Sequence, residues 1–388
     1  MIKKVIYVGY MPLTEKVKQD FFLEEVKSSG IRVEFWDLSK IYFPKVVFPT
    51  YNNSYAMVFN SLLELENNLS IQEINQTLFI SLMTYNGIIL SLFNLFTKYN
   101  CQTAFFGRGA LPPPIKNSKY FTSKFKYIFK PYKLLTYLTN KYALFQKKIG
   151  RIKPYDIIFS AGEQGLKTIG HGYHIEQLHS NIIKINSFDY DNYCRSKNCD
   201  NLVVKKYCLF LDEYLPYHQD FKMFGVKTIE PEEYYGSLNT FFNQIENKFN
   251  LEVVVAAHPK SERAKNDYYF RNRRVFYNKT SELTKFAEFS IAHCSSSISF
   301  SILYRKPIFF IYTNSLKINM SNYFNSILGF SKALGSCLIN IDDYEIGEID
   351  VRKIQLLKYI DYQYNYLTSK ESERKQSLEI FLETITGL

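Results

Sequence analysis

A pair of adjacent carboxylates ends one apolar segment of the chain. The run 207–212 ends in Asp212, Glu213 comes directly after it, and His218 follows a few residues later. A carboxylate or an imidazole fixed at the edge of a binding site can act as a general base. Neighbours in an extended chain point to opposite sides, so we expect only one of the two carboxylates to face a substrate. The alternative is a solvated loop or a helix cap.

A second segment places an imidazole directly after a continuous apolar run. His258 follows residues 251–257 and precedes Pro259 and Lys260. Pro259 restricts the backbone at the exit of the expected strand, and Lys260 offers a point charge that suits phosphate. His258 can donate a proton or a hydrogen bond to a leaving phosphate oxygen. The alternative is a histidine whose polar atoms are satisfied inside the fold.

A third segment leads from an apolar run into consecutive hydroxyl residues. Ser295, Ser296 and Ser297 follow the expected strand 290–293 and open an expected helix at 296–304. The N-terminus of a helix attracts anions through its free amides and dipole, and serine hydroxyls add donors. We therefore expect these serines to contact a phosphate. Simple N-capping by Ser295 or Ser296 is the alternative, and the two roles are compatible.

The elements that would position these segments alternate between strands and helices, which indicates parallel sheets covered on both faces. The longest apolar stretch, 78–96, is interrupted by polar residues, and we interpret it as a buried helix rather than a membrane span. The expected strands are 4–9, 31–36, 102–106, 157–160, 207–212, 251–257, 275–277, 290–293 and 307–312. The expected helices are 15–28, 78–98, 232–249, 281–289, 296–304 and 351–388.

The chain of 388 residues is long enough for two hydrophobic cores. The stretch 192–201 is polar and carries no periodicity, so we place the domain boundary there. The predicted fold class is α/β, with two Rossmann-like domains that face a cleft. We expect an N-terminal domain at 1–195, a C-terminal domain at 202–345 and C-terminal helices at 346–388. Ligands of such sheets bind beyond the carboxyl ends of the strands.

An acidic pair, then His-Pro, then a hydroxyl run, each after an expected strand, resembles a motif set of bacterial sialyltransferases and related Kdo transferases of GT-B architecture. The resemblance covers about residues 205–315. Segments 186–191 and 210–218 also look like parts of proteins from O-antigen and capsule clusters. Two departures stand out: Tyr214 occupies the place of a glycine, and Glu213 and His258 are 45 positions apart (258 − 213).

The resemblance implies an inverting glycosyltransferase that moves a sialic-acid-like or Kdo-type sugar from a CMP donor to a glycan acceptor. Asp212 or Glu213 would be the base, His258 would assist the leaving phosphate, and residues 295–297 would hold that phosphate. It implies no metal and no cofactor beyond the nucleotide sugar. It also implies that the C-terminal helix crosses back to the first domain. The alternatives are a UDP- or GDP-sugar transferase, a sugar-nucleotide epimerase of similar fold, or a non-catalytic assembly protein of polysaccharide synthesis.

Two segments of the first half follow expected strands and could serve the acceptor or the sugar, as could His218 in the second half. In the first, Gly109 permits close backbone approach, and Arg108 can meet a carboxylate or phosphate. In the second, 160–165, Glu163 is a further candidate base. Structural turns are the alternative for both segments. Neither is a dinucleotide-binding fingerprint, because the GxGxxG spacing is missing.

The positive charge of the chain is concentrated in one region. Net charge is +11, and residues 101–155 contain no Asp or Glu, while lysines and arginines alternate there with aromatic residues. This pattern suits an anionic membrane surface, which we expect to meet residues 108–153. RNA would be another anionic partner, but no RNA-binding motif accompanies the patch, so we expect no nucleic acid. A solvated basic face is the alternative.

The expected location follows from the N-terminus and the cysteines. The first apolar run is too short for a signal peptide, and the six cysteines form neither a CxxC pair nor a zinc-ligand spacing. We therefore expect a cytoplasmic protein that lies peripherally on the inner face of the cytoplasmic membrane. Its lipid-linked or oligosaccharide acceptor would be found at that surface.

Overall fold

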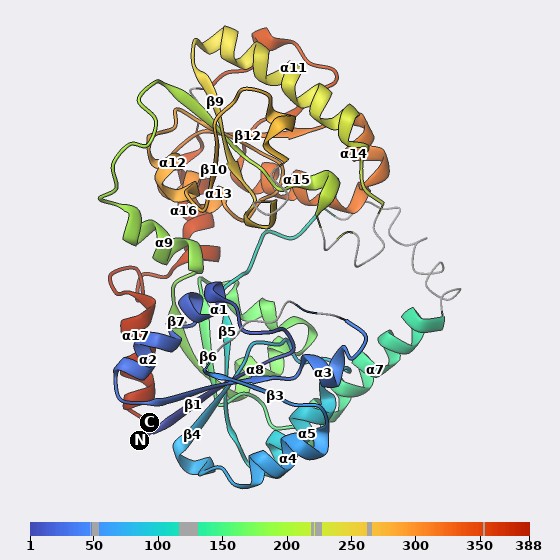
Figure 1. The fold of residues 1–388 in the computed structure, drawn as a ribbon, viewed down its shortest axis with the longest axis vertical. Helices are drawn as coiled ribbons and strands as arrows, with labels where there is room; N and C mark the ends of the chain where they lie inside the picture. The colour runs from blue at the N-terminus through green and yellow to red at the C-terminus, as the bar shows by residue number, and fades with distance from the viewer. Residues whose placement is uncertain are drawn as a thin grey trace. The chain divides into compact units, whose positions relative to one another are not determined.

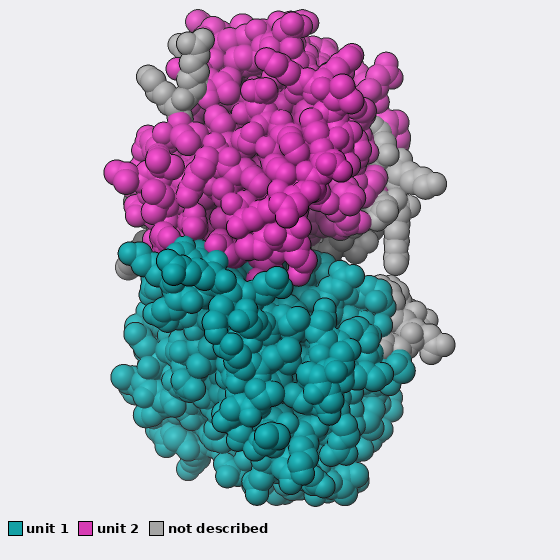
Figure 2. All heavy atoms as spheres, turned by 90° about the vertical axis from the view of Figure 1, so that its left-hand side faces the viewer, with its two compact units in different colours: residues 1–110, 118–188, 368–388 teal, residues 111–117, 189–367 magenta. Residues whose placement is uncertain are grey.

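The computed structural model describes the whole chain except residues 47, 49–53, 116–130, 219, 220, 222–226, 262–265, 352 and 353. The chain divides into two compact units, coloured separately in Figure 2. Unit 1 comprises residues 1–110, 118–188 and 368–388, and unit 2 comprises residues 111–117 and 189–367. The last 21 residues (388 − 367) thus belong to the unit that begins the chain.

A parallel sheet forms the centre of unit 1 (Figure 1). In the described part of this unit, seven strands lie in the order β3-β2-β1-β4-β5-β6-β7. Every residue of β1, β4 and β6 is buried, as expected for central strands covered on both faces. The strands are β1 (Lys4–Gly9), β2 (Arg32–Asp37), β3 (Ala56–Val58), β4 (Thr77–Ser81), β5 (Gln102–Gly107), β6 (Ile157–Ala161) and β7 (Asn181–Ile185).

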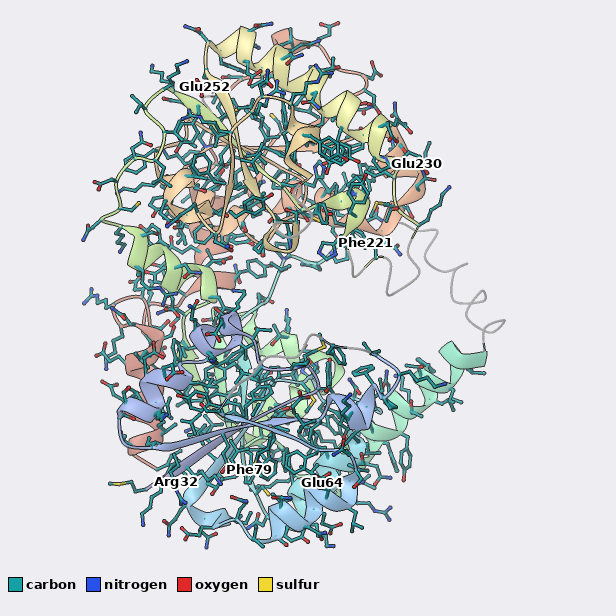
Figure 3. The ribbon with its side chains drawn as sticks, viewed as in Figure 1. Arg32, Glu64, Phe79, Phe221, Glu230 and Glu252 are labelled. Atoms are coloured by element: carbon teal, nitrogen blue, oxygen red, sulfur yellow. The ribbon has the colours of Figure 1, made fainter. Side chains whose placement is uncertain are left out.

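Helices cover both faces of this sheet with two separate hydrophobic clusters. On one face Phe79, labelled in Figure 3, packs against Trp36 and against Phe96 of α5. On the other face Phe159 packs edge-on against Phe381 of α17. The helices of unit 1 are α1 (Glu15–Asp20), α2 (Leu23–Ser28), α3 (Ser39–Tyr42), α4 (Leu62–Ser70), α5 (Leu90–Lys98), α7 (Pro131–Lys148), α8 (Tyr173–His179) and α17 (Ser377–Thr386).

Unit 2 is built around a second parallel sheet. Its described residues form six strands in the order β10-β9-β8-β11-β12-β13. Tyr207 and Phe210, three positions apart on β8, point to opposite faces. Phe210 meets Phe242 of α11, while the hydroxyl of Tyr207 donates to the Leu283 carbonyl of α12. The strands are β8 (Tyr207–Leu211), β9 (Glu252–Ala257), β10 (Val275–Tyr277), β11 (Ser290–Ala292), β12 (Ile308–Tyr312) and β13 (Leu338–Asn340).

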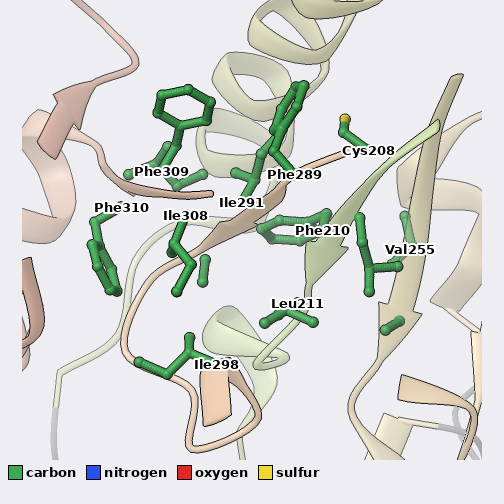
Figure 4. Packing of buried hydrophobic residues seen from close by; sticks show 14 of the residues in the cluster. Cys208, Phe210, Leu211, Val255, Phe289, Ile291, Ile298, Ile308, Phe309 and Phe310 are labelled. Carbon is green, nitrogen blue, oxygen red and sulfur yellow. The ribbon is translucent and has the colours of Figure 1, made fainter. Parts of the chain in front are cut away.

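One hydrophobic cluster holds unit 2 together. Figure 4 shows Phe210, Leu211 and Ile291 of the central strands packed with their neighbours. The helices of this unit are α9 (Phe188–Ser196, whose first residue belongs to unit 1), α11 (Pro231–Phe249), α12 (Thr280–Phe286), α13 (Ile298–Leu303), α14 (Asn314–Asn319), α15 (Ser321–Leu334) and α16 (Leu356–Tyr362). The two doubly wound sheets confirm the predicted pair of Rossmann-like domains.

Three predicted helices are wrong in part. The predicted helix 78–98 begins as strand β4, and only α5 is helical within it, because a short buried strand and a buried helix share the same apolar composition. The predicted helix 15–28 is split at Phe22, which adopts φ 61°. The predicted helix 351–388 is interrupted between α16 and α17. None of the helices in the described residues is both long and apolar enough to span a membrane.

The returning C-terminal segment is fixed to unit 1 by Asn186, which follows β7. Its side-chain oxygen accepts a hydrogen bond from Thr368 at 2.6 Å, and its amide donates to the Lys375 carbonyl at 2.8 Å. Its backbone carbonyl accepts from Nε of Arg108 at 2.7 Å. A buried asparagine with these partners ties β5, β7 and the segment before α17 together.

A buried ion pair fixes the last turn of α7 on unit 1. The ammonium of Lys147 donates to the carboxylate of Glu176 on α8, and both side chains are fully buried. Glu176 also accepts the backbone amide of Tyr155 at 2.9 Å and the hydroxyl of Ser180 at 2.8 Å. The ring of Tyr85 lies 4.4 Å from the ammonium. Because the charges are desolvated, each depends on the other for compensation.

We predict that Glu176→Gln lowers the free energy of unfolding by about 3–5 kcal/mol, because it leaves the ammonium of Lys147 buried and uncompensated. Urea unfolding of the full chain measures the change. The matched control is Glu66→Gln, which removes the partner of Lys98 in a solvent-exposed pair and should change stability little. A loss for Glu176→Gln no larger than that of the control contradicts the prediction.

Candidate functional site

The three motif segments of unit 2 meet at one edge of its sheet. Strand β8 lies between β9 and β11, and Leu211 at its end is in register with Ala256 and Ala292. The strands are parallel, so their carboxyl ends lie at the same edge. Asp212, His258 and the loop after Ala292 therefore emerge side by side.

Asp212 holds two stretches of backbone at this edge. Its side chain is only 5% exposed. One carboxylate oxygen accepts the amide of Tyr214 at 3.0 Å, and the other accepts the amide of His258 at the longer distance of 3.5 Å. Asp212 therefore links its own loop to the start of the His-Pro segment.

Glu213 makes the corresponding connection on the other side of β8. Its Oε1 accepts the backbone amide of Cys294, the residue before the serine run, at 2.8 Å. Its Oε2 accepts the hydroxyl of Tyr323 from α15 at 2.5 Å. Glu213 is partly exposed, whereas Asp212 is buried. Of the two residues, Glu213 is thus the more exposed.

Burial sets the protonation of both carboxyl groups. It raises the pKa of Asp212 to about 6, against the opposing effect of the amides of Tyr214 and His258. It raises the pKa of Glu213 to about 7, although the hydrogen bonds from Tyr323 and Cys294 act in the opposite direction. Loss of solvation destabilises the charged form, which explains the direction of both shifts. Glu213 can therefore exchange a proton near neutral pH.

His258 begins the loop that follows β9 and is partly buried. Its ring lies 5.1 Å from the ring of His218, so the two imidazoles of the predicted site are neighbours. The carbonyl of His258 accepts from both the amide and the hydroxyl of Ser261, which closes the turn. Pro259 is exposed and starts a short 3-10 turn. The side chain of Lys260 lies outside the described part of the chain.

The serine run lies between β11 and α13. The hydroxyl oxygen of Ser295 accepts the amide of Ser297 at 3.2 Å, within the turn that precedes the helix. Ser296 is exposed, and its carbonyl accepts the hydroxyl of Ser299 at 2.8 Å. The helix begins at Ile298, two residues later than predicted. The N-cap of α13 is Ser297, which makes no side-chain capping bond, so the predicted capping by Ser295 or Ser296 is wrong, and the bond from Ser297 to Ser295 closes the turn before the helix.

Of the predicted acceptor-side residues, His218 lies in unit 2 beside His258, and the other three lie in unit 1. Arg108 is 3% exposed and donates to the carbonyls of Asp20 and Asn186, so its guanidinium is largely used within the fold. Gly109 has open space where a side chain would begin. Glu163 is exposed and pairs with Lys184 at 3.0 Å. These contacts suit an architectural role for Arg108 and leave Gly109 and Glu163 at the surface.

Three features of the site were not predicted from the sequence. Tyr323 stands 110 positions after Glu213, and only the fold brings them together. His293 lies in the core, where its Nε2 is 2.9 Å from the hydroxyl of Tyr234 and burial lowers its pKa to about 3. Tyr214 has φ 54°, the left-handed conformation that glycine adopts most easily.

No group of three or more His, Cys, Asp or Glu side chains in the described ranges is arranged to hold a metal ion.

Comparison with known proteins bears on the fold. No protein-family model and no curated protein matches the sequence. The wall teichoic acid polymerase TagF is similar over 99% of this chain and 89% of its own, at 13% identity and a TM-score of 0.53. A variant of TagF is similar over 99% of this chain and 88% of its own, at 13% identity and a TM-score of 0.52. The UDP-GlcNAc 2-epimerase of Methanocaldococcus jannaschii is similar over 100% of both chains, at 12% identity and a TM-score of 0.48. The likeness to TagF agrees with the predicted GT-B class of two Rossmann-like domains.

We predict that the stability of the protein relative to its Glu213→Gln variant depends on pH. The folded chain keeps the proton of Glu213 to a higher pH than the unfolded chain, because the pKa rises from 4.5 to about 7 on folding. The resulting stabilisation is complete below pH 4.5 and is lost as the pH rises through about 7. The side chain at position 213 of the variant is neutral at every pH. The variant should therefore gain stability relative to the wild type as the pH rises from 5 to 8.

Urea unfolding at a series of pH values measures this difference. Glu163→Gln, which changes an exposed carboxylate on unit 1, is the control and should show no such trend. A constant difference between wild type and Glu213→Gln across the range contradicts the prediction.

Proposed function

We propose that the protein is an inverting glycosyltransferase of surface polysaccharide synthesis that works at the inner face of the cytoplasmic membrane. The donor would be a CMP-activated sialic-acid-like or Kdo-type sugar, and the acceptor a glycan, either free or carried on a lipid. The observation that carries the proposal is the meeting of an acidic pair, an imidazole and a serine run at one sheet edge of unit 2.

The proposed base is Glu213. A base that works near neutral pH needs a pKa close to that pH and access to the acceptor hydroxyl. Glu213 has a pKa of about 7 and is partly exposed, whereas Asp212 is buried with both oxygens on backbone amides. Asp212 is then a positioning residue that holds the amide of His258.

The proposed role of the other two segments is to stabilise the departing CMP phosphate. Charge develops on the phosphate as the sugar leaves, and preorganised donors that meet it lower the barrier. His258 would donate through its ring, and the serines 295–297 would donate through their hydroxyls. Glu213 fixes the serine run by accepting the amide of Cys294, so the base and the phosphate donors are held in one unit.

We predict that CMP raises the melting temperature of the protein and that UDP, GDP and TDP do not. The His258→Ala variant should lose most of the CMP effect, because it removes the proposed phosphate donor. His174→Ala, which changes an exposed histidine on α8 of unit 1, is the matched control. A thermal shift with UDP or GDP instead would favour a transferase or epimerase that uses those nucleotides. No shift with any nucleotide would favour a non-catalytic assembly protein.

We predict that Glu213→Gln lowers kcat/KM for transfer from the CMP donor by about 100- to 10,000-fold.

We predict that in Tyr323→Phe the acidic limb of the pH profile of kcat/KM moves to higher pH. That variant removes a hydrogen bond that lowers the pKa of Glu213, and the base acts only when deprotonated. Tyr99→Phe, which removes a donor to the partly exposed Glu66 on unit 1, is the control. An unchanged acidic limb in Tyr323→Phe would rule out Glu213 as the base.

A further inference from the structure

Helix α7 presents an apolar face that has no partner in the described structure of unit 1. Side chains on this part of the helix project away from the rest of the unit (Figure 3). The spacing of three and four residues places several of them on one stripe of the helix. Seven large apolar or aromatic residues here are between 41% and 63% exposed: Leu134, Leu135, Tyr137, Leu138, Tyr142, Phe145 and Ile149.

The opposite face of α7 is fixed to the body of unit 1. Ala143, Gln146 and Lys147 are buried, and Lys147 makes the ion pair with Glu176. The Ala143 carbonyl accepts the hydroxyl of Tyr85 at 2.7 Å. At the next turn, Gly87 lies so close to α7 that a Cβ there would stand 2.7 Å from the backbone of Thr139. These contacts set the rotation of the helix, so the apolar stripe cannot turn inward.

Cations flank the apolar stripe of α7. Lys141 and Lys148 on the helix and Arg151 just after it are exposed. The sequence from 101 to 155 supplies no acidic residue to neutralise them. An apolar stripe flanked by lysines and arginines fits the boundary between acyl chains and anionic headgroups. Lysine is depleted at the interfaces between proteins, while its long stem can reach from an apolar layer to the headgroups.

We propose that the outer face of α7, defined by the seven residues above with Lys141 and Lys148, docks unit 1 on an anionic lipid surface. The apolar side chains enter the headgroup boundary, and the two ammonium groups meet lipid phosphates. The proposed partner of this surface is a lipid membrane. The proposal rests on the proposed function only in one respect: docking would give the enzyme access to a lipid-linked acceptor.

The test is flotation of the full chain with phosphatidylcholine vesicles that do or do not contain phosphatidylglycerol. Wild type should float with the anionic vesicles and be released by salt. The variant Leu135→Ser/Leu138→Ser/Phe145→Ser should lower the bound fraction about tenfold or more. Lys141→Glu/Lys148→Glu should abolish the preference for anionic vesicles. Leu63→Ser/Ile71→Ser, which changes exposed apolar residues elsewhere on unit 1, is the matched control and should float like wild type.

Four results would overturn the proposal: wild type that does not float, a triple serine variant that floats like wild type, a self-association in sedimentation velocity that the triple variant abolishes, or binding to RNA in place of vesicles. Circular dichroism melting shows that each variant is folded. Transfer to a soluble oligosaccharide separates the two proposals. If transfer is absent while flotation behaves as expected, only the proposed function fails. If transfer is intact while the protein does not float with vesicles, only the proposed docking surface is wrong.

Discussion

The two carboxylates after β8 are the interaction on which the candidate site depends. Asp212 accepts the amide that begins the His-Pro loop, and Glu213 accepts the amide that precedes the serine run. A strand in the centre of a sheet thus fixes the loops of both neighbouring strands through side-chain oxygens. Without these acceptors the amides at the edge of a buried sheet would lack partners, which is costly.

The same arrangement gives Glu213 its chemistry. A carboxylate that is desolvated by the sheet edge and still accepts two hydrogen bonds has competing influences on its pKa, and desolvation prevails. The group that positions the serine run is therefore also a group that can take a proton near neutral pH. Unit 1 also holds a desolvated carboxylate, Glu176, but the charge of this one is compensated by Lys147. Together the two side chains hold α7 in a fixed rotation.

Residues that follow apolar runs were predictable from sequence, because a buried strand must end where polar residues begin. Asp212, His258 and the serines were found in this way, and parallel pairing brings their strand ends together. Tyr323 could not be found, because it contacts Glu213 only through the packing of α15. Strand β4 was read as part of a helix, because composition alone does not distinguish a short buried strand from a buried helix. The burial of Arg108 could not be predicted from the sequence either, because its acceptors Asp20 and Asn186 lie far from it along the chain.

The proposed function depends on the binding of a nucleotide's phosphate by the imidazole of His258 and the serine run. The most direct measurement is NMR of the full chain carrying carbon-13-labelled histidine, titrated with CMP, with the resonance of His258 assigned from a His258→Asn variant. We expect CMP to move the signal of His258 and to leave those of His174 and His179 on unit 1 in place. Saturable binding of CMP with an unmoved His258 signal would contradict it.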